Sequence, residues 1–167
     1  MGNGIFLIQT DGSLVEMPQS PYNSEEVLQD LLAKYPNILT GNQNEDSEPT
    51  RWLLVKQEMG VPDNQFVGNR WSLDHLFLDQ NGIPTLVEVK RATDTRIRRE
   101  VVGQMLDYAA NAIVYWPIEK IRENLEQTLL ENDEDEDEIF AIFLDDEINR
   151  EEFWKRVETN LRSGRVR

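Results

Sequence analysis

Charged and polar side chains stand inside otherwise apolar segments in the middle of this 167-residue chain. Two carboxylates and a lysine near the end of a buried strand are costly to hold there unless something compensates their charge. A divalent cation with a phosphate beside it would compensate them better than another side chain would. The pattern therefore predicts a metal-dependent phosphodiesterase. The residues concerned are Asp74, Glu88, Lys90, Gln104 and Tyr108.

The composition excludes several other classes of protein. With 39% hydrophobic residues, the chain can build the core of one domain. It has no cysteine and a single histidine, His75, which excludes disulfides, thiolate zinc sites and any site built on two histidines. No segment approaches the roughly 20 apolar residues of a membrane span, and residues 1–9 lack the features of a signal peptide. We therefore expect a cytoplasmic protein that does not enter a membrane.

The net charge of −15 opposes binding of nucleic acid, which depends on Lys and Arg side chains that neutralise phosphates. The charge is unevenly distributed, however. Residues 131–138 carry seven acids in eight positions, whereas residues 90–99 carry five basic side chains and a single acid, Asp94. The field beside the polar residues can therefore be positive although the whole chain is acidic.

Alternation and turn residues predict the elements of the first part of the chain. Residues 5–9 and 13–17 flank Asp11-Gly12 and predict a β-hairpin. A helix is expected from Asn23, which can cap it with Glu26 three residues later, as far as residue 35. Its apolar stripe would consist of Val27, Leu28, Leu31, Leu32 and Tyr35.

Three strands are expected to form the core sheet. Residues 52–57 are apolar on both faces, which predicts a central strand. Residues 71–78 and 84–90 predict two more strands around the turn signal Asp79-Gln80-Asn81-Gly82. The chain would be an α/β protein whose core, with the N-terminal hairpin, spans residues 1–116.

Helical spacing predicts helices over residues 96–112, from Pro117 to about Leu130, and over residues 151–161. The first would carry Ile97, Val101, Met105 and Ala109 on one stripe. The acidic run 131–138 predicts a solvated loop or a frayed helix end, since like charges repel, and residues 139–144 fit a strand or a helix. Residues 117–167 would thus form a helical extension that contains an acidic loop.

The core sheet would be unfinished. The only later stretch that opens like a strand is Arg165-Val166-Arg167, after Ser163-Gly164 breaks the preceding helix. An unfinished sheet leaves an exposed edge, which invites pairing. We therefore expect either a longer parent protein, in which a further strand or domain follows, or a homodimer that covers the edge.

Strand geometry predicts how the polar residues meet. Side chains alternate along a strand, so Glu88 and Lys90 point to the same face. A three-residue loop ending at Gly82 would place Asp74 directly opposite Glu88, because glycine supplies the left-handed residue that this loop requires. The two carboxylates, with the Val89 carbonyl as a third ligand, would bind Mg²⁺ or Mn²⁺. Lys90 would orient the attacking water or stabilise charge that develops on phosphorus.

The ordered set resembles the PD-(D/E)XK nuclease superfamily, which has the restriction-endonuclease-like fold. The resemblance covers residues 23–112: a helix, three strands that carry Asp74 and then Glu88-Val89-Lys90, and a helix on which Gln104 and Tyr108 match the Gln-x-x-x-Tyr motif of RecB-type members. It implies a Mg²⁺- or Mn²⁺-dependent nuclease acting on DNA. The implied catalytic residues are Asp74, Glu88, Lys90 and Gln104. The implied metal ligands are Asp74, Glu88, Val89 and Glu25; Glu25 is chosen because it borders the apolar stripe of the first helix, whereas Glu26 faces away from it. The implied substrate-binding residues are Tyr108, Arg91, Arg96 and Arg99.

Other interpretations stay open at this point. Glu88 and Lys90 can form an ordinary salt bridge on a half-exposed strand, and His75 is expected in the core because it alternates away from Asp74. Leu73 stands where the superfamily has proline. The alternative functions are an inactive module of the same fold that binds a protein partner through its acidic surface, and an interaction domain whose acidic loop mimics nucleic acid.

Overall fold

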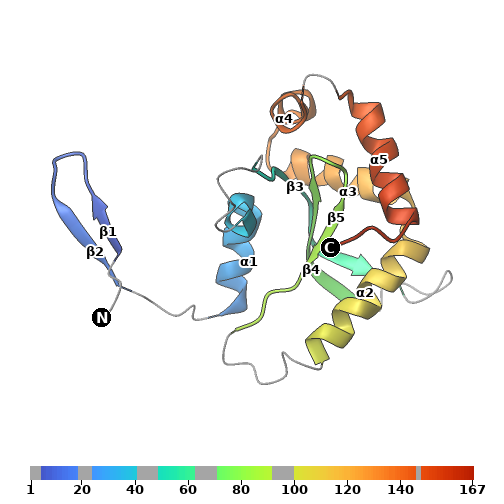
Figure 1. Ribbon diagram of the computed structural model, residues 1–167, viewed down its shortest axis with the longest axis horizontal. Helices are drawn as coiled ribbons and strands as arrows, with labels where there is room; N and C mark the ends of the chain where they lie inside the picture. The colour runs from blue at the N-terminus through green and yellow to red at the C-terminus, as the bar shows by residue number, and fades with distance from the viewer. Residues whose placement is uncertain (1–4, 19–23, 41–48, 63–70, 92–99, 146–147) are drawn as a thin grey trace.

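A three-stranded antiparallel sheet lies at the centre of the protein (Figure 1). The computed structural model describes residues 5–18, 24–40, 49–62, 71–91, 100–145 and 148–167, and the fold is given for these residues. Strands β3 (Trp52–Val61), β4 (Trp71–Asp79) and β5 (Pro84–Val87) follow one another across the sheet in chain order. With the helices they make a mixed α/β protein, as expected.

The expectation that residues 52–57 form a central strand is wrong, because β4 is central and β3 lies at an edge. β3 packs against helix α3 (Ile118–Glu131) and also against the 3-10 helix η1 (Pro36–Thr40). Its two faces are apolar because other elements cover them. An apolar pattern on both sides of a strand therefore reports covered faces and not the position of the strand in its sheet.

The turn between β4 and β5 has the predicted three-residue loop. The Asp79 N–H donates to the Ile83 carbonyl at 3.3 Å, and the Gly82 N–H donates to the Asp79 carbonyl at 2.9 Å. Gly82 adopts a left-handed φ of 71°. The ladder pairs His75 with Val87, which fixes the predicted parity. β5 ends at Val87, however, so Glu88 and Lys90 follow the strand and are not part of it.

Helices cover both faces of the sheet (Figure 1). Helix α1 (Glu25–Lys34) lies on one side, and α2 (Val102–Tyr115), α3 and α5 (Arg150–Arg162) lie on the other. The two segments that the sequence separates, residues 1–116 and 117–167, both contribute to one large core. Among its buried members are Leu53, Val55, Leu76, Leu78, Leu86, Tyr108, Ile121, Leu125, Phe153 and Val157.

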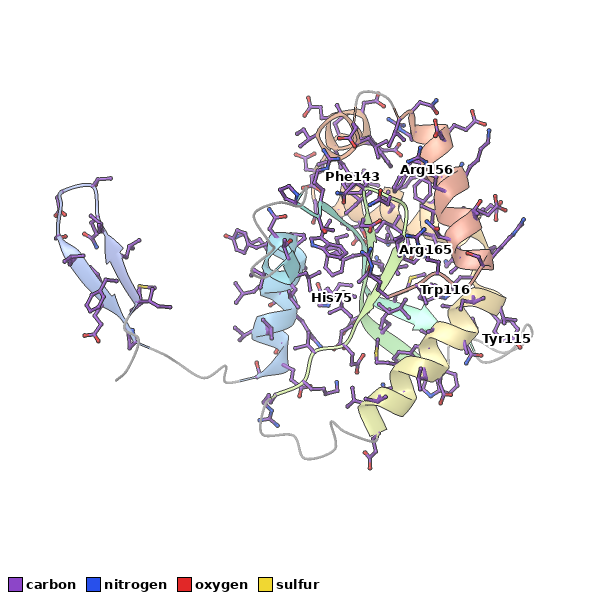
Figure 2. All side chains as sticks on the ribbon, viewed as in Figure 1. His75, Tyr115, Trp116, Phe143, Arg156 and Arg165 are labelled. Atoms are coloured by element: carbon purple, nitrogen blue, oxygen red, sulfur yellow. The ribbon has the colours of Figure 1, made fainter. Side chains whose placement is uncertain are left out.

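His75 lies between the sheet and α1, as Figure 2 shows, and the prediction of a core histidine is confirmed. Its Nε2 lies 2.9 Å from the Gln29 carbonyl of α1, and its ring stacks on Phe77 at a centroid distance of 5.6 Å. Burial lowers the pKa of His75, and the contact with the Gln29 carbonyl offsets this only in part. The neutral ring therefore donates to Gln29 and ties α1 to β4.

α1 departs from its predicted start and stripe. Its N-cap is Ser24, whereas the predicted cap Asn23 lies outside the described residues. Of the predicted apolar stripe, Leu32 is buried, but Val27 and Tyr35 are exposed. The predicted apolar stripe includes residues that do not reach the sheet, because only the residues of α1 that face β4 are covered.

Residues 131–138 are not wholly a loop. Glu136, Asp137 and Glu138 form the first turn of helix α4 (Glu136–Phe143), and the Asp135 side chain caps it by accepting from the Glu138 N–H. Acidic side chains are favourable at a helix N-terminus because they complement the helix dipole. The buried residues Phe140 and Phe143 hold the helix against the core, and the alternative of a strand over residues 139–144 is excluded.

The N-terminal hairpin is present as predicted, with strands β1 (Ile5–Ile8) and β2 (Leu14–Met17). All eight strand residues are exposed, and the hairpin stands apart from the other elements in Figure 1. At the opposite end of the chain, Arg167 pairs with the outer edge of β5. Its N–H donates to the Pro84 carbonyl at 2.9 Å and its carbonyl accepts from the Leu86 N–H at 2.7 Å. No helix in the described ranges is long and apolar enough to cross a membrane.

Candidate nuclease site

The two predicted carboxylates meet where β4 and β5 diverge. Continuing the ladder by one residue beyond His75 and Val87 places Asp74 opposite Glu88. Asp74 is half-buried on β4, and its Oδ2 accepts a hydrogen bond from the Val89 N–H at 2.7 Å. This bond holds the segment that follows β5 against β4, so the predicted ligand residues Asp74, Glu88 and Val89 are neighbours.

Glu88 is held by a lysine and an amide. Its side chain is only 5% exposed, and its Oε1 accepts from Lys90 Nζ at 2.7 Å and from Gln104 Nε2 at 3.5 Å. Burial raises the pKa of the Glu88 carboxyl, the charge of Asp74 raises it further, and the hydrogen bond from Lys90 offsets these effects only in part. The carboxylate form of Glu88 is therefore held at a cost, which a further cation would reduce.

Lys90 contacts more groups than the salt-bridge partner, Glu88, that the sequence suggests. Besides Glu88, its Nζ donates to the Val89 carbonyl at 3.0 Å and lies 3.7 Å from Glu25 Oε2. Burial lowers the pKa of Lys90, but the hydrogen bond to Glu88 and the charges of Glu88, Asp74 and Glu25 outweigh it, and the net effect raises this pKa. The lysine is therefore an ammonium ion that is enclosed by acceptors.

The predicted Gln-x-x-x-Tyr pair reaches this site from α2. Gln104 Nε2 donates both to Glu88 Oε1 and to the Tyr108 hydroxyl, which in turn donates to the Ser72 carbonyl of β4 at 3.3 Å. Tyr108, which the resemblance implies as a substrate-binding residue, is only 2% exposed. It lies on the core side of α2, where burial raises the pKa of its phenol. Tyr108 anchors Gln104 and does not itself face solvent.

Glu25 comes from the first turn of α1 and lies at the site, whereas Glu26 is exposed. Glu25 Oε1 accepts from the Arg91 N–H at 3.0 Å and lies 4.0 Å from Arg91 Nε. The Arg91 side chain is otherwise exposed, as a substrate-binding residue would require. Arg96 and Arg99, together with Ile97, lie outside the described residues.

One oxygen of the site, Glu88 Oε2, is buried and has no hydrogen-bond partner among the described residues. Unpartnered buried polar atoms are rare and call for an explanation such as an ion. No group of three or more Asp, Glu or His side chains in the part of the chain that the structure describes is arranged to hold a metal. The groups here that could hold Mg²⁺ or Mn²⁺ are two carboxylates, Asp74 and Glu88, and the Val89 carbonyl.

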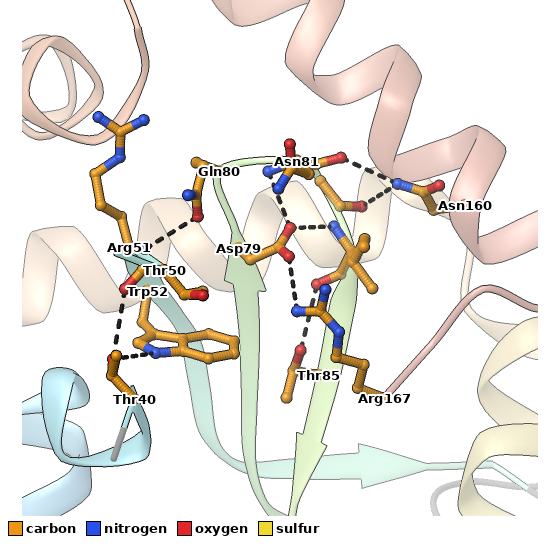
Figure 3. A network of polar contacts seen from close by, with 12 residues as sticks. Thr40, Thr50, Arg51, Trp52, Asp79, Gln80, Asn81, Thr85, Asn160 and Arg167 are labelled. Atoms are coloured by element: carbon orange, nitrogen blue, oxygen red, sulfur yellow. Dashed lines mark hydrogen bonds and ion pairs between the residues drawn. The ribbon is translucent and has the colours of Figure 1, made fainter. Parts of the chain in front are cut away.

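The sequence predicts Asp79 only as part of a turn, but Asp79 also lies at the centre of a polar network (Figure 3). Asp79 is 1% exposed, and its Oδ1 accepts from the N–H groups of Asn81 and Ile83 at 2.9 and 2.8 Å. Its Oδ2 accepts from Arg167 Nη1 at 2.8 Å. Asn160 of α5 donates to the Asn81 and Gly82 carbonyls. This network fixes the loop that sets the register of Asp74 and Glu88, and no local sequence signal could have paired residues 79 and 167.

Comparisons of the chain with protein-family models, with curated proteins and with solved structures find no match. The interpretation of the site therefore rests on its own geometry and on the motif resemblance.

Proposed function

We propose that this chain is a metal-dependent nuclease that hydrolyses phosphodiester bonds in DNA, built on a restriction-endonuclease-like core. The observation that carries the proposal is Glu88. It is a buried carboxylate beside a second carboxylate, with one oxygen held by Lys90 and Gln104 and the other without a partner among the described residues. Such an arrangement lowers the stability of the folded protein. A divalent cation bound by Asp74, Glu88 and the Val89 carbonyl would neutralise the two carboxylates and reduce this cost.

The order of the elements supports the proposed core. Helix α1, strands β3 to β5 and helix α2 follow in the order that the resemblance implies. The site residues come from α1 (Glu25), from β4 (Asp74), from the segment after β5 (Glu88) and from α2 (Gln104). The fold that the chain resembles adds a strand to its core sheet after the Gln104 helix. Arg167 pairs with the outer edge of β5, which is where such a strand would lie.

Each residue of the proposed site has a distinct task. The metal, when bound, would supply the Lewis acidity that polarises the phosphodiester. Lys90 places a positive charge where negative charge develops on the phosphate oxygens. Gln104, anchored by Tyr108, presents an amide beside Glu88 that orients a phosphate oxygen or the attacking water. Arg91 contributes the positive charge that a DNA backbone requires in this acidic chain. A cytoplasmic location, which suits a chain without cysteine, belongs to the same proposal.

The proposal is tested by a cleavage assay on labelled single-stranded, duplex and branched DNA and on RNA, with Mg²⁺ or Mn²⁺. We expect cleavage of at least one DNA form, and a loss of about 100-fold or more in the Lys90→Ala and Asp74→Asn variants. Lys120→Ala is the matched control because Lys120 is an exposed lysine of α3 that pairs with Glu123 of the same helix. Equal rates in wild type and both site variants would contradict the proposal. Metal binding without cleavage of any form would favour the inactive module instead.

A further inference from the structure

Lys90 already contacts groups that would hold the metal. Its ammonium donates to Glu88 Oε1 at 2.7 Å and to the Val89 carbonyl at 3.0 Å. Both are predicted metal ligands, and the charge of the third, Asp74, also stabilises the ammonium. The side chain is only 21% exposed. In the protein without metal, the lysine therefore supplies a positive charge at these ligands.

An ammonium and a divalent cation would compete for the Val89 carbonyl. A Mg²⁺ or Mn²⁺ ion bound to the Val89 carbonyl would lie within about 2.1 Å of that oxygen. It would then lie close to an ammonium only 3.0 Å from the same atom. Like charges at such a distance repel, and the partial burial of Lys90 and Glu88 strengthens the repulsion. Binding of the metal thus requires Lys90 to leave the Val89 carbonyl.

The next acceptor beyond this position is Glu25. Its Oε2 lies 3.7 Å from Lys90 Nζ, and its Oε1 is fixed by the Arg91 N–H, one residue along the chain. Glu25 stands in the first turn of α1, where the helix dipole favours its negative charge. Within the described residues it does not converge with Asp74 and Glu88 into a three-carboxylate metal group. Among the residues that the structure describes, its polar side-chain contacts are with Lys90 and Arg91.

We infer that Lys90 is an internal counter-ion that the metal displaces, and that Glu25 is the positioning residue that receives it. This inference rests on the proposed function. Without metal, the ammonium neutralises Glu88 and is withheld from substrate. When a divalent cation binds, the ammonium moves toward Glu25, at the rim of the site, where it can meet a phosphate. The lysine thus becomes available only when the metal is in place, and Glu25 is not a metal ligand, contrary to what the resemblance implies.

The first test measures Mn²⁺ affinity by titration calorimetry on the full chain. Lys90→Met removes the competing charge and keeps the length of the side chain, so we expect it to bind Mn²⁺ about tenfold more tightly than wild type. Lys120→Met, which removes an exposed lysine, should leave the affinity unchanged. Glu25→Gln should change it by no more than about twofold, whereas Asp74→Asn should lose it. Equal or weaker binding by Lys90→Met, or a loss in Glu25→Gln as large as in Asp74→Asn, would overturn the inference.

The second test needs no variant and so does not depend on whether Lys90→Met folds. Wild type is acetylated briefly with and without about 10 mM Mg²⁺, a concentration chosen to exceed weak-site affinities, and modification of each lysine is measured by peptide mass mapping. We expect Lys90 to react about fivefold faster with Mg²⁺, while the exposed Lys120 and Lys155 react equally in both samples. An unchanged or slower reaction of Lys90 would overturn the inference.

The two tests also separate this inference from the proposed function. If neither wild type nor any variant binds Mn²⁺, the metal site and the nuclease proposal both fail. If wild type binds Mn²⁺ through Asp74 but Lys90→Met binds no more tightly, only the displacement of Lys90 fails.

Discussion

The protein contains two hairpins that share one turn and differ in their surroundings. In β1–β2 the loop ends at Gly12, with φ 81°, and in β4–β5 it ends at Gly82, with φ 71°. In both, the N–H of this glycine donates to the carbonyl of the residue before the loop at 2.9 Å. Yet every strand residue of β1 and β2 is exposed, whereas most residues of β4 and β5 are buried.

The two hairpins show that the same turn forms whether or not other elements cover the strands. A glycine that supplies the left-handed residue sets the register of both hairpins. Only β4–β5 is covered by helices, and these bring Glu25 and Gln104 to the carboxylates. A two-stranded hairpin without other contacts is marginally stable in water. We therefore expect β1–β2 to contribute little to the free energy of unfolding, and β4–β5 to dominate both stability and function.

The largest difference is expected for the carboxylates that cap the two turns. Asp79→Ala leaves two backbone N–H groups and Arg167 without their acceptor, and should lower the free energy of unfolding by about 3 kcal/mol. Asp11→Ala removes the acceptor of the exposed Ser13 N–H and should leave it unchanged. Urea unfolding of both variants measures this. Similar losses in the two would show that the hairpins are equally integrated.

The two glycines should also differ. Alanine at either position adopts an unfavourable left-handed φ, at a cost of about 1 kcal/mol. At Gly82 the new Cβ would also lie 2.9 Å from the Val157 N and 3.1 Å from Arg156 Cβ of α5, whereas at Gly12 it would meet nothing within 4 Å. Gly82→Ala should therefore lower the free energy of unfolding by about 2 kcal/mol. Gly12→Ala should affect only β1–β2 and leave the main unfolding transition in place. A larger loss for Gly12→Ala would reverse the comparison.

Mg²⁺ should act on the buried hairpin alone. For a site with a Kd of about 1 mM, about 10 mM Mg²⁺ would stabilise the folded protein by roughly 1.4 kcal/mol and raise Tm by about 4 °C. Asp74→Asn should abolish this increment, and it should stabilise the metal-free protein because it removes one of two close carboxylates. Thermal unfolding gives Tm, and amide exchange should slow around β4 and β5 but not in β1 and β2. Protection of β1 and β2 would mean that the metal binds elsewhere.

The smallest effect is a pH dependence carried by His75. Its pKa in the folded protein lies below the ordinary value of 6.5, because burial disfavours the charged ring. The unfolded chain therefore takes up a proton first as pH falls. The stability due to His75 is complete above pH 6.5 and is lost as pH falls toward its lowered pKa. The pKa of Glu88 is raised, so its contribution to stability falls as pH rises, opposite to that of His75.

The difference between wild type and His75→Gln isolates the histidine, since glutamine keeps a donor for the Gln29 carbonyl. Urea unfolding between pH 5.5 and 7.5 should show a steeper loss on acidification in wild type than in the variant. Parallel curves would show that His75 is not the group that titrates. Amide exchange in β1–β2, which has no histidine, should be the same in wild type and in His75→Gln across this pH range.

Local patterns predicted the parts that depend on near neighbours. The register of Asp74 and Glu88 followed from loop parity and Gly82, and helices α3 and α5 from their spacing. Features that depend on residues distant in sequence were missed. β3 lies at an edge although both of its faces are apolar, because α3 and η1 cover them. The first turn of α4 depends on Phe140 and Phe143 packing into the core. The position of Lys90 on the Val89 carbonyl depends on side-chain placement that no spacing reveals.

The proposed metal site consists of Asp74, Glu88 and the Val89 carbonyl. Anomalous X-ray scattering from crystals grown with saturating Mn²⁺ tests this site directly. We expect one anomalous peak about 2.2 Å from an Asp74 oxygen, from Glu88 Oε2 and from the Val89 oxygen, with Lys90 Nζ moved off the Val89 carbonyl toward Glu25. Crystals without a peak between the two carboxylates, with Lys90 still bonded to Glu88 and Val89, would contradict it.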